Sequence, residues 1–460
     1  MIRLFRVFVP TGSLAMLLSE TVWVTAAFVL ATYAVMPTDP ELFLLYDNGL
    51  VRILVVVLSV VVTMHFQDLY TDLYVKSRVK LLQQLSMTAG IAFLLQGLTS
   101  YVYPGLRVPL RIMLPGCALA VLAIFVWRIF FSAYVLQVVG RDKVLLVGAT
   151  APLGELARHI QEHPERGSQV VGYVTGEFPP GTQLAGGAVL GGLADLREIV
   201  ESTLPSRIVV GVPEGGEGLP LADLLDLRYA GQTVEEAAAA YEQVAGRVCL
   251  KTLRPDQIIS SGEYRPRSQD ILYQLAAHRS LAFLGLLASS PLMLAAALAV
   301  RLSSPGPVLN RHIRVGRDGR RFTLYKFRSM RGPEGAAGVW APKDDPRVTW
   351  VGRILRIARI DELPQLINVL RGDMAIIGPR AERPEFVDRL TELIPCYPQR
   401  HVVRPGITGW AQINQEIDRE RDAIGKLEYD LYYIKNMSAS LDAFILLHTI
   451  KMVVLSRGAD

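Results

Sequence analysis

An acidic pair flanked by arginines is the part of this sequence best suited to chemistry. Asp361 and Glu362 are adjacent, and five arginines lie near them in the sequence: Arg353, Arg356, Arg359, Arg371 and Arg380. Pro364, an apolar stretch and Gly372 follow. This pattern predicts a short helix, because proline is tolerated in a first turn and glycine ends a helix. The amides and the dipole at the start of a helix favour negative charge, so we expect both carboxylates to stay ionised beside arginines that bind phosphate.

An acidic helix cap with surface ion pairs is the simpler alternative for this pair. Phosphate transfer needs an attacking group, a metal ion or arginines that disperse charge, and exclusion of water. Histidine is scarce, with seven in all, and His159 and His163 have no cysteine nearby, which argues against a catalytic zinc ion. Oxygen ligands remain, so we expect Mg²⁺ held by a carboxylate and by the diphosphate of a substrate.

Sequence blocks around the acidic pair resemble those of the bacterial sugar transferases, the polyprenyl-phosphate glycosyl-1-phosphate transferases of exopolysaccharide synthesis. DELPQLINVLRGDMAIIGPR contains the pair, SSPGPV, YKFRSM and DPRV precede it, and RPGITGWAQIN follows. The order and spacing match through residues 271–460. Upstream, the chain resembles the large membrane-bound members, which have several spanning helices and a Rossmann-like domain.

The resemblance assigns roles to individual residues. It implies that Asp361 is the nucleophile and that Glu362 is a magnesium ligand, so both belong to the catalytic set. Five basic residues are matched to positions that bind substrate phosphate: Lys326, Arg328, Arg356, Arg380 and Arg404. It also implies a helix that enters and leaves the membrane on one face, with its break at Ser290 and Pro291.

The composition indicates a membrane protein with roughly two to four structural units. Hydrophobic residues make up 51% and charged residues 20%, and the mean hydropathy is +0.30. The net charge of +5 suits anionic substrates or lipid head groups better than nucleic acid, so we expect no nucleic-acid partner. The three cysteines lie far apart and predict a reduced protein without a disulfide framework.

Four apolar runs within residues 1–140 predict a bundle of transmembrane helices. They cover residues 14–35, 50–66, 82–99 and 112–138, and each approaches or exceeds the length of about 18 residues that a spanning helix needs. Basic residues lie before the first run, between the second and third, and after the fourth, whereas the first outer loop is acidic. This asymmetry places both ends of the bundle on the cytoplasmic side of the bacterial inner membrane.

Residues 141–253 alternate short apolar strands with helices, which predicts a Rossmann-like α/β domain facing the cytoplasm. Strands are expected at 143–150, 170–174 and 207–212. The turn from Gly148 to Gly154 lacks a full GxGxxG, and no acidic residue ends the second strand. Nucleotide binding is therefore weakly supported, and a structural or regulatory role is favoured.

A polar linker is expected at residues 254–270, followed by an α+β monotopic catalytic domain at 271–460. Its apolar run at 281–302 carries Ser290 and Pro291 near the middle, and proline removes a backbone hydrogen bond. A fifth crossing would place the acidic pair outside, away from cytoplasmic nucleotide sugars. We therefore expect this helix to be re-entrant. The basic segment at 312–330 predicts a hairpin that turns at Asp318 and Gly319, close to lipid head groups.

The sequence predicts transfer of a sugar-1-phosphate from a UDP-sugar to polyprenyl (undecaprenyl) phosphate in the membrane, with release of UMP. Two alternatives stay open. A nucleotide-sugar-modifying Rossmann enzyme would need a dinucleotide fingerprint and a Tyr-x-x-x-Lys pair, which residues 141–250 lack. A catalytically silent scaffold or regulator of polysaccharide export would have lost polar residues that the blocks retain. The sugar, the native polyprenol and the presence of a homodimer are left open.

Overall fold

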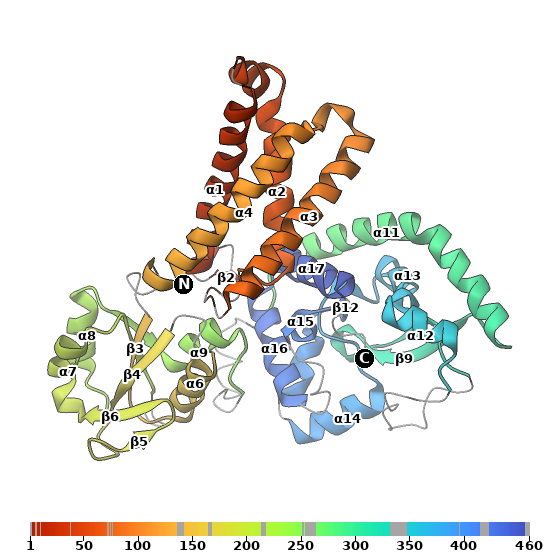
Figure 1. Cartoon of the computed structure of the whole chain (residues 1–460). Coiled ribbons are helices and arrows are strands. Elements are labelled where there is room, and N and C mark those ends of the chain that lie inside the picture. Colours follow the sequence, from red (N-terminus) through yellow and green to blue (C-terminus); the bar gives the residue numbers. More distant parts are fainter. Residues whose placement is uncertain are drawn as a thin grey trace. The chain divides into compact units, whose positions relative to one another are not determined.

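The computed structural model describes residues 2–4, 7–9, 11–36, 38–70, 73, 75, 77–135, 142–163, 168–212, 218–250, 253, 264–331, 347–394, 396–414 and 423–455. The chain divides into two compact units. Figure 1 shows its helices and strands, coloured along the sequence. The first comprises Met1–Leu4 and Phe8–Glu236, and the second comprises Phe5–Val7 and Ala237–Asp460.

Four long helices form a bundle in the first unit (Figure 1), as the apolar runs predict. The helices are α1 (Thr11–Val35), α2 (Gly49–Phe66), α3 (Arg78–Val102) and α4 (Leu110–Phe130). Short elements adjoin them: β1 (Ile2–Leu4), β2 (Val7–Val9), η1 (Leu42–Tyr46), η2 (Pro104–Leu106) and η3 (Phe131–Val135). Each long helix is long and apolar enough to cross a membrane, and α1 packs chiefly on α4 while α2 packs on α3.

A buried ion pair ties this bundle together. The guanidinium of Arg128 on α4 donates two hydrogen bonds to the Glu20 carboxylate on α1, at 2.6 and 3.1 Å. A third hydrogen bond, of 2.9 Å, runs from Arg128 to the main-chain oxygen of Leu69. Both side chains are almost fully buried. Charged groups persist among apolar helices only when they are paired, so Glu20 and Arg128 fix how α1 and α4 pack.

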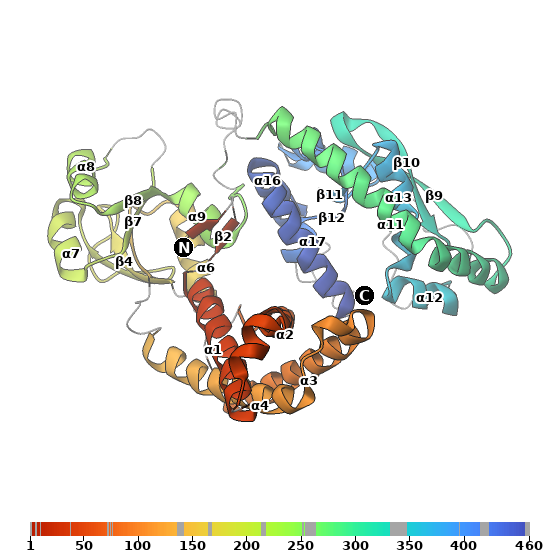
Figure 2. The same cartoon turned by 90° about the horizontal axis from the view of Figure 1, so that it is seen from above.

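A six-stranded sheet follows the bundle, with the strand order β5-β6-β4-β3-β7-β8. All neighbours run parallel except β5 and β6. The strands are β3 (Asp142–Val147), β4 (Ser168–Val174), β5 (Gln183–Leu184), β6 (Gly187–Gly191), β7 (Arg207–Val210) and β8 (Thr233–Glu236). Helices α7 (Leu196–Thr203) and α8 (Leu221–Tyr229) lie on one side and α6 (Ala151–Glu162) on the other, as Figures 1 and 2 show, with η5 (Leu193–Asp195) before α7. The predicted alternation of strands and helices is present.

The boundary after the sheet differs from the expected position at residue 253. Helix α9 (Ala237–Ala245) belongs to the second unit. Trp410 donates from Nε1 to the main-chain oxygen of Gly246 at 2.7 Å, and Lys435 pairs with Glu242 at 3.0 Å. These long-range contacts join α9 to the second unit and could not be read from local composition. Of the expected linker 254–270, residues 254–263 lie outside the described residues.

The longest helix, α11 (Ser268–Ser303), begins within the expected linker and extends beyond the apolar run 281–302. Its first turns carry Gln274, whose amide donates to Tyr433 at 2.8 Å and to the main-chain oxygen of Ile377 at 3.2 Å. Polar residues therefore continue the helix because folded partners bind them. Pro291 removes the hydrogen bond that Leu287 would accept, and Ser290 Oγ donates to that oxygen at 2.8 Å instead. Figure 1 shows the axis of α11 bending.

The rest of the second unit is a compact α+β arrangement below α11 in Figure 1. Its elements are β9 (Leu309–Val315), η6 (Arg317–Gly319), β10 (Arg321–Phe327), α12 (Trp350–Ile357), η7 (Ile360–Glu362), α13 (Gln365–Arg371), β11 (Ala375–Ile377), α14 (Pro384–Leu393), η8 (Tyr397–Val402), β12 (Gly406–Thr408), α15 (Trp410–Asn414), α16 (Ala423–Asn436) and α17 (Ala439–Val454). Strands β9 and β10 form the predicted hairpin, which turns through Asp318 and Gly319. Helix α13 packs on both α11 and β10.

Candidate active site

The acidic pair lies in a single 3₁₀ turn immediately before α13. This turn, η7, contains Asp361 and Glu362, and α13 starts one residue after Pro364. Gly372 ends α13 in the left-handed conformation, with φ of 90°. Arg359 also has a positive φ, 53°, which turns the chain sharply from α12 into η7. The predicted short helix and its termination are therefore present.

Three basic side chains surround the carboxylate of Glu362. Lys326 on β10 donates to Glu362 Oε1 at 2.7 Å. Arg380 lies 3.9 Å from the same oxygen, and Arg359 lies 4.0 Å from Oε2. Burial alone would raise the pKa of Glu362, but these cations lower it to about 2. Glu362 is therefore ionised at neutral pH, as the sequence predicts.

Asp361 has a different environment from its neighbour. Its side chain is buried, and burial raises the pKa of Asp361 above its ordinary value, although the charges of Lys326 and Arg356 oppose the shift. The two neighbouring carboxylates therefore differ in how strongly their ionised forms are stabilised. Because Lys326 binds Glu362 directly, Asp361 is the more weakly neutralised and the more basic of the two.

Asn368 holds the pair against the strand that carries Lys326. It is fully buried on α13, and its amide donates to the main-chain oxygen of Thr323 at 2.7 Å. Its oxygen accepts from the main-chain nitrogen of Tyr325 at 3.2 Å. These bonds pin α13 to β10 and bring Lys326 to Glu362. The sequence interpretation missed Asn368, although an amide inside an apolar helical stripe is itself a signal of a buried hydrogen-bonding role.

Two of the predicted phosphate-binding residues also make structural contacts. Arg356 donates from Nε to Ser329 Oγ at 2.9 Å, and its charge lowers the pKa of Asp361. Arg328 is buried, and its Nη2 donates to the main-chain oxygens of Val300 at 3.3 Å and Ser304 at 2.6 Å. Arg328 therefore caps the C-terminal end of α11 beside the SSPGP segment, where a cation offsets the helix dipole.

The remaining two predicted phosphate-binding residues follow the acidic pair in the sequence. Half-exposed Arg380 reaches Glu362, while its main-chain oxygen accepts a 3.0 Å hydrogen bond from buried Arg400. Arg404 donates to the main-chain oxygen of Gly372 at 3.0 Å. The described contacts therefore join Lys326, Arg359 and Arg380 at Glu362, whereas those of Arg328 and Arg404 are made elsewhere.

This geometry suits transfer of a phosphate-bearing group. A buried carboxylate with raised basicity stands beside a second carboxylate and a group of fixed cations. Such cations stabilise phosphate oxygens without reorganising during the reaction. Their environments shift the pKa values of the two carboxylates in opposite directions. Such a difference is usual when neighbouring acidic groups have different roles.

Comparisons with known proteins identify a family whose model matches the part of the chain that contains this site. A family model described as bacterial sugar transferase matches residues 271–456. The chain is 32% identical over 346 residues to a UDP-glucose:undecaprenyl-phosphate glucose-1-phosphate transferase from Xanthomonas campestris pv. campestris, covering 70% of this chain and 69% of that protein.

Two other relatives match a smaller share of this chain. A UDP-N-acetylgalactosamine-undecaprenyl-phosphate N-acetylgalactosaminephosphotransferase from Aeromonas hydrophila is 44% identical over 47% of this chain and 51% of its own length. A UDP-glucose:undecaprenyl-phosphate glucose-1-phosphate transferase from Escherichia coli (strain K12) is 47% identical over 39% of each chain. The chain thus spans about half or less of the length of these two relatives.

Proposed function

The chain belongs to the bacterial sugar transferase family, and from this premise we propose that it transfers a sugar-1-phosphate from a UDP-sugar to undecaprenyl phosphate, releasing UMP. The observation that carries the proposal is the pair formed by buried Asp361 and nearly buried Glu362, with Lys326, Arg359 and Arg380 beside Glu362. The relatives' names support this type of reaction. The product would be a lipid-linked sugar that begins exopolysaccharide assembly.

We assign the nucleophile to Asp361. Its carboxylate oxygen attacks the sugar-bearing β-phosphorus of the UDP-sugar, and the bond from this phosphorus to the bridging oxygen breaks as UMP leaves. An oxygen of undecaprenyl phosphate then attacks the same phosphorus and releases the Asp361 carboxylate. Burial supports this role, because a desolvated carboxylate is a stronger nucleophile than one bound by a cation. Lys326, Arg359 and Arg380 offset the phosphate charges.

Glu362 fits a magnesium ligand by the chemistry of its donor atoms. It is a hard oxygen donor, ionised at neutral pH and nearly buried. Lys326 binds Oε1 at 2.7 Å, whereas Arg359 lies 4.0 Å from Oε2. When bound, Mg²⁺ would neutralise diphosphate charge. Glu362 would hold it on the substrate side of the site.

The proposed reaction is tested with the purified full chain in detergent, undecaprenyl phosphate, Mg²⁺ and a panel of radiolabelled UDP-sugars. At least one UDP-hexose or UDP-N-acetylhexosamine should give a labelled lipid and equimolar UMP. Because the sugars in the relatives' names differ, the panel also identifies the donor. No labelled lipid with any donor would refute the reaction and favour the export scaffold.

Replacing Glu362 by glutamine is expected to raise the Mg²⁺ concentration required for half-maximal rate at least ~10-fold and to lower the maximal rate. The neutral amide keeps the shape of the side chain but loses the charge that attracts the cation. Initial rates measured against Mg²⁺ concentration report the change. The matched control is Glu385→Gln, since Glu385 is exposed on α14. Indistinguishable Mg²⁺ curves for the two variants would reassign the metal ligand.

We propose that the chain lies in the bacterial inner membrane and that α11 is re-entrant. The sheet domain (residues 142–236) and the second unit, called the catalytic unit from here on, would both lie in the cytoplasm. At 36 residues, α11 would be about 54 Å long if straight, well above the hydrocarbon thickness of about 30 Å. Helix α11, which contains Pro291, bends along its length, and Ser290 donates a hydrogen bond to the main-chain oxygen of Leu287. Both features support a helix that enters and leaves the membrane on one face.

This topology predicts which engineered cysteines react from outside the cell. In a variant without the three native cysteines, Arg320→Cys in the exposed turn of the hairpin should resist an impermeant thiol reagent. Arg107→Cys, between α3 and α4, should react and serves as the positive control. Labelling of both positions in intact cells would mean that α11 crosses the membrane.

The sheet domain is best interpreted as Rossmann-like. Its parallel strands stand in the order β6-β4-β3-β7-β8, so the first strand in the chain is central and later strands extend to either side. This is the strand order of one doubly wound family of folds. Gly148 turns the chain after β3 with φ of 98°, as such folds require. We propose a structural or regulatory role for the domain.

A further inference from the structure

We propose that the C-terminal end of α6 in the sheet domain is a binding site for a divalent transition-metal ion of the Zn²⁺ type, held by His159, Glu162 and His163. This site is distinct from the magnesium site proposed at Glu362. Its role would be to fasten the end of α6 rather than to catalyse a reaction.

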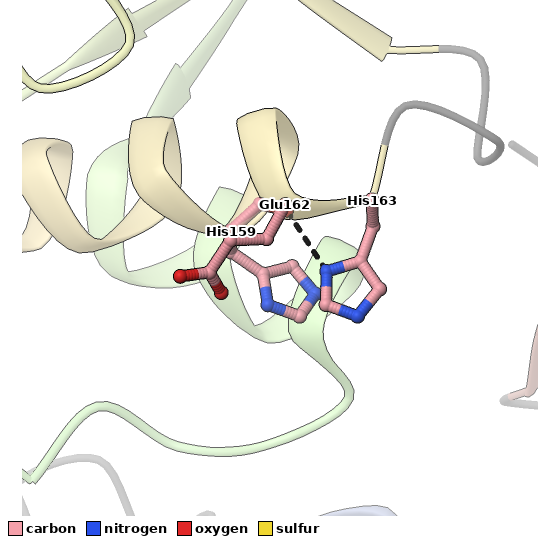
Figure 3. Close-up of side chains that lie close together, drawn as sticks. All are labelled: His159, Glu162 and His163. Atoms are coloured by element: carbon pink, nitrogen blue, oxygen red, sulfur yellow. Dashed lines mark hydrogen bonds between the residues drawn. The ribbon is translucent and has the colours of Figure 1, made fainter.

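The proposal rests first on convergence of the three side chains. Each offers one ligand atom, and these atoms all lie within 4.8 Å of one another. Figure 3 shows both imidazoles projecting from the same end of the helix, with the Glu162 carboxylate beside them. Positions four apart on a helix share one face, so His159 and His163 meet because of the helix itself. The chain has seven histidines, and two of them meet here.

The orientation of His163 also suits a ligand. Its Nδ1 lies 3.1 Å from the main-chain oxygen of His159, drawn as the dashed line in Figure 3. A carbonyl in this position takes the proton of Nδ1, which leaves Nε2 with the free electron pair. Metal-binding histidines commonly have their second nitrogen fixed in this way. The two rings stack with centroids 4.4 Å apart, so a rotation of their side-chain torsions would bring one ion into the plane of both rings.

Electrostatics at this end of the helix favour a cation. Helix α6 ends at Glu162, and the dipole presents partial negative charge there. The carboxylate of Glu162 adds a full negative charge, while neighbouring Arg158 pairs with Glu155 one turn earlier, at 3.5 Å. A bound dication takes the two imidazoles as neutral ligands.

The donor set selects the class of metal. Two imidazoles and one carboxylate match zinc, cobalt or nickel better than magnesium or calcium, which prefer oxygen ligands alone. Tetrahedral Zn²⁺ would hold its donors about 3.3 Å apart, so the three groups must approach slightly. Glu162 is exposed and His163 half-buried, so rotation of these side chains accomplishes this without disturbing the core.

The test measures metal binding by the full-length protein in detergent, carrying an affinity tag that contains no histidine. Excess Mg²⁺ is present throughout, so that sites for hard cations are occupied. Zn²⁺ binding is followed by calorimetry, and Co²⁺ binding by its visible absorption, which reports nitrogen ligation. The variants are His159→Ala, His163→Ala and the double replacement. Gln161→Ala, an exposed neighbour on the same turn, is the matched control.

The wild-type chain should bind one Zn²⁺ or Co²⁺, and each single replacement should weaken that binding at least ~10-fold. The double variant should lose the Co²⁺ absorption, whereas Gln161→Ala should keep it. Zn²⁺ should raise the unfolding temperature of wild type but not of the double variant, whose unchanged circular dichroism would show that it is folded. Absence of binding in wild type, or equal binding by the folded double variant, would overturn the proposal.

Discussion

Asp361→Asn is expected to abolish sugar-phosphate transfer, lowering the rate at least ~10³-fold. The amide oxygen has the same position as the carboxylate oxygen but little nucleophilicity, so no covalent intermediate forms. Incubated with a UDP-sugar and without the lipid acceptor, wild type should release about one UMP per active site in a burst. The variant should release none above background. Mass spectrometry should find a sugar-phosphate adduct on the wild-type peptide that contains Asp361.

The matched control for this experiment is Asp388→Asn, because Asp388 is an exposed carboxylate on α14 of the same unit. It should keep both burst and turnover. Direct attack of the lipid phosphate on the UDP-sugar would need no protein nucleophile and would give neither burst nor adduct. If the wild-type chain gave neither the UMP burst nor the adduct, and Asp361→Asn kept substantial activity, Asp361 would have only an electrostatic role.

Arg400→Met is expected to destabilise the catalytic unit by about 3–5 kcal/mol, the usual cost of removing one partner from a buried ion pair. Arg400 pairs with Asp430 on α16 at 2.8 Å, and both side chains are almost fully buried. Its Nη1 donates to the Tyr397 hydroxyl at 2.6 Å, and Nη2, the nitrogen that faces Asp430, also donates to the main-chain oxygen of Arg380 at 3.0 Å. The substitution therefore leaves the buried Asp430 carboxylate without its partner. It also removes the hydrogen bond that holds the main chain at Arg380, whose side chain lies near Glu362.

Thermal unfolding of the purified chain at a fixed scan rate measures this loss. The control is Arg389→Met on α14, an exposed arginine whose replacement should change stability by no more than about 0.5 kcal/mol. Adding Asp430→Asn to Arg400→Met should recover part of the stability, because no unpaired charge remains buried. If Arg400→Met unfolded at the same temperature as Arg389→Met, the pair would have no structural importance.

The loss of folding stability caused by Arg400→Met should also depend on pH. Burial raises the pKa of Asp430 to about 6 even with Arg400 beside it, and loss of Arg400 raises it further. A carboxyl whose pKa is higher in the folded state than in the unfolded state loses stability as the pH rises through that interval. The variant should therefore come closest to wild type in mildly acidic buffer and differ most in mildly alkaline buffer.

Local patterns in the sequence were sufficient for most elements. The four apolar runs, the hairpin at Asp318 and Gly319, and the termination of α13 at Gly372 each depend on residues a few positions apart, and all are present. The same holds for the helix containing Pro291, because the serine that satisfies the freed carbonyl is its immediate neighbour. Composition and spacing are enough to predict an element when the residues that determine it lie only a few positions apart in the sequence.

Only the tertiary structure decided how the site is divided between its residues. Adjacent helical residues point in different directions, so the sequence allows Asp361 and Glu362 different tasks, but only the fold shows that Lys326, 36 positions away, hydrogen-bonds Glu362. Arg328, which the sequence places in the expected phosphate-binding set, caps the end of α11 through a contact 24 positions away in the sequence. A charged side chain has the same appearance in a sequence whether it binds a helix end or a substrate.

The same reason explains the boundary of the second unit and the three ligands at α6. Helix α9 joins the catalytic unit through Trp410 and Lys435, which are more than 160 positions away, so no local change of composition marks the transition. His159 and His163 are visible as a pair in the sequence, but only the end of the helix shows Glu162 converging on them. Motifs and periodicity determined the elements and the family of this protein, whereas the pairing of charges required the folded chain, because burial and distance select the partner.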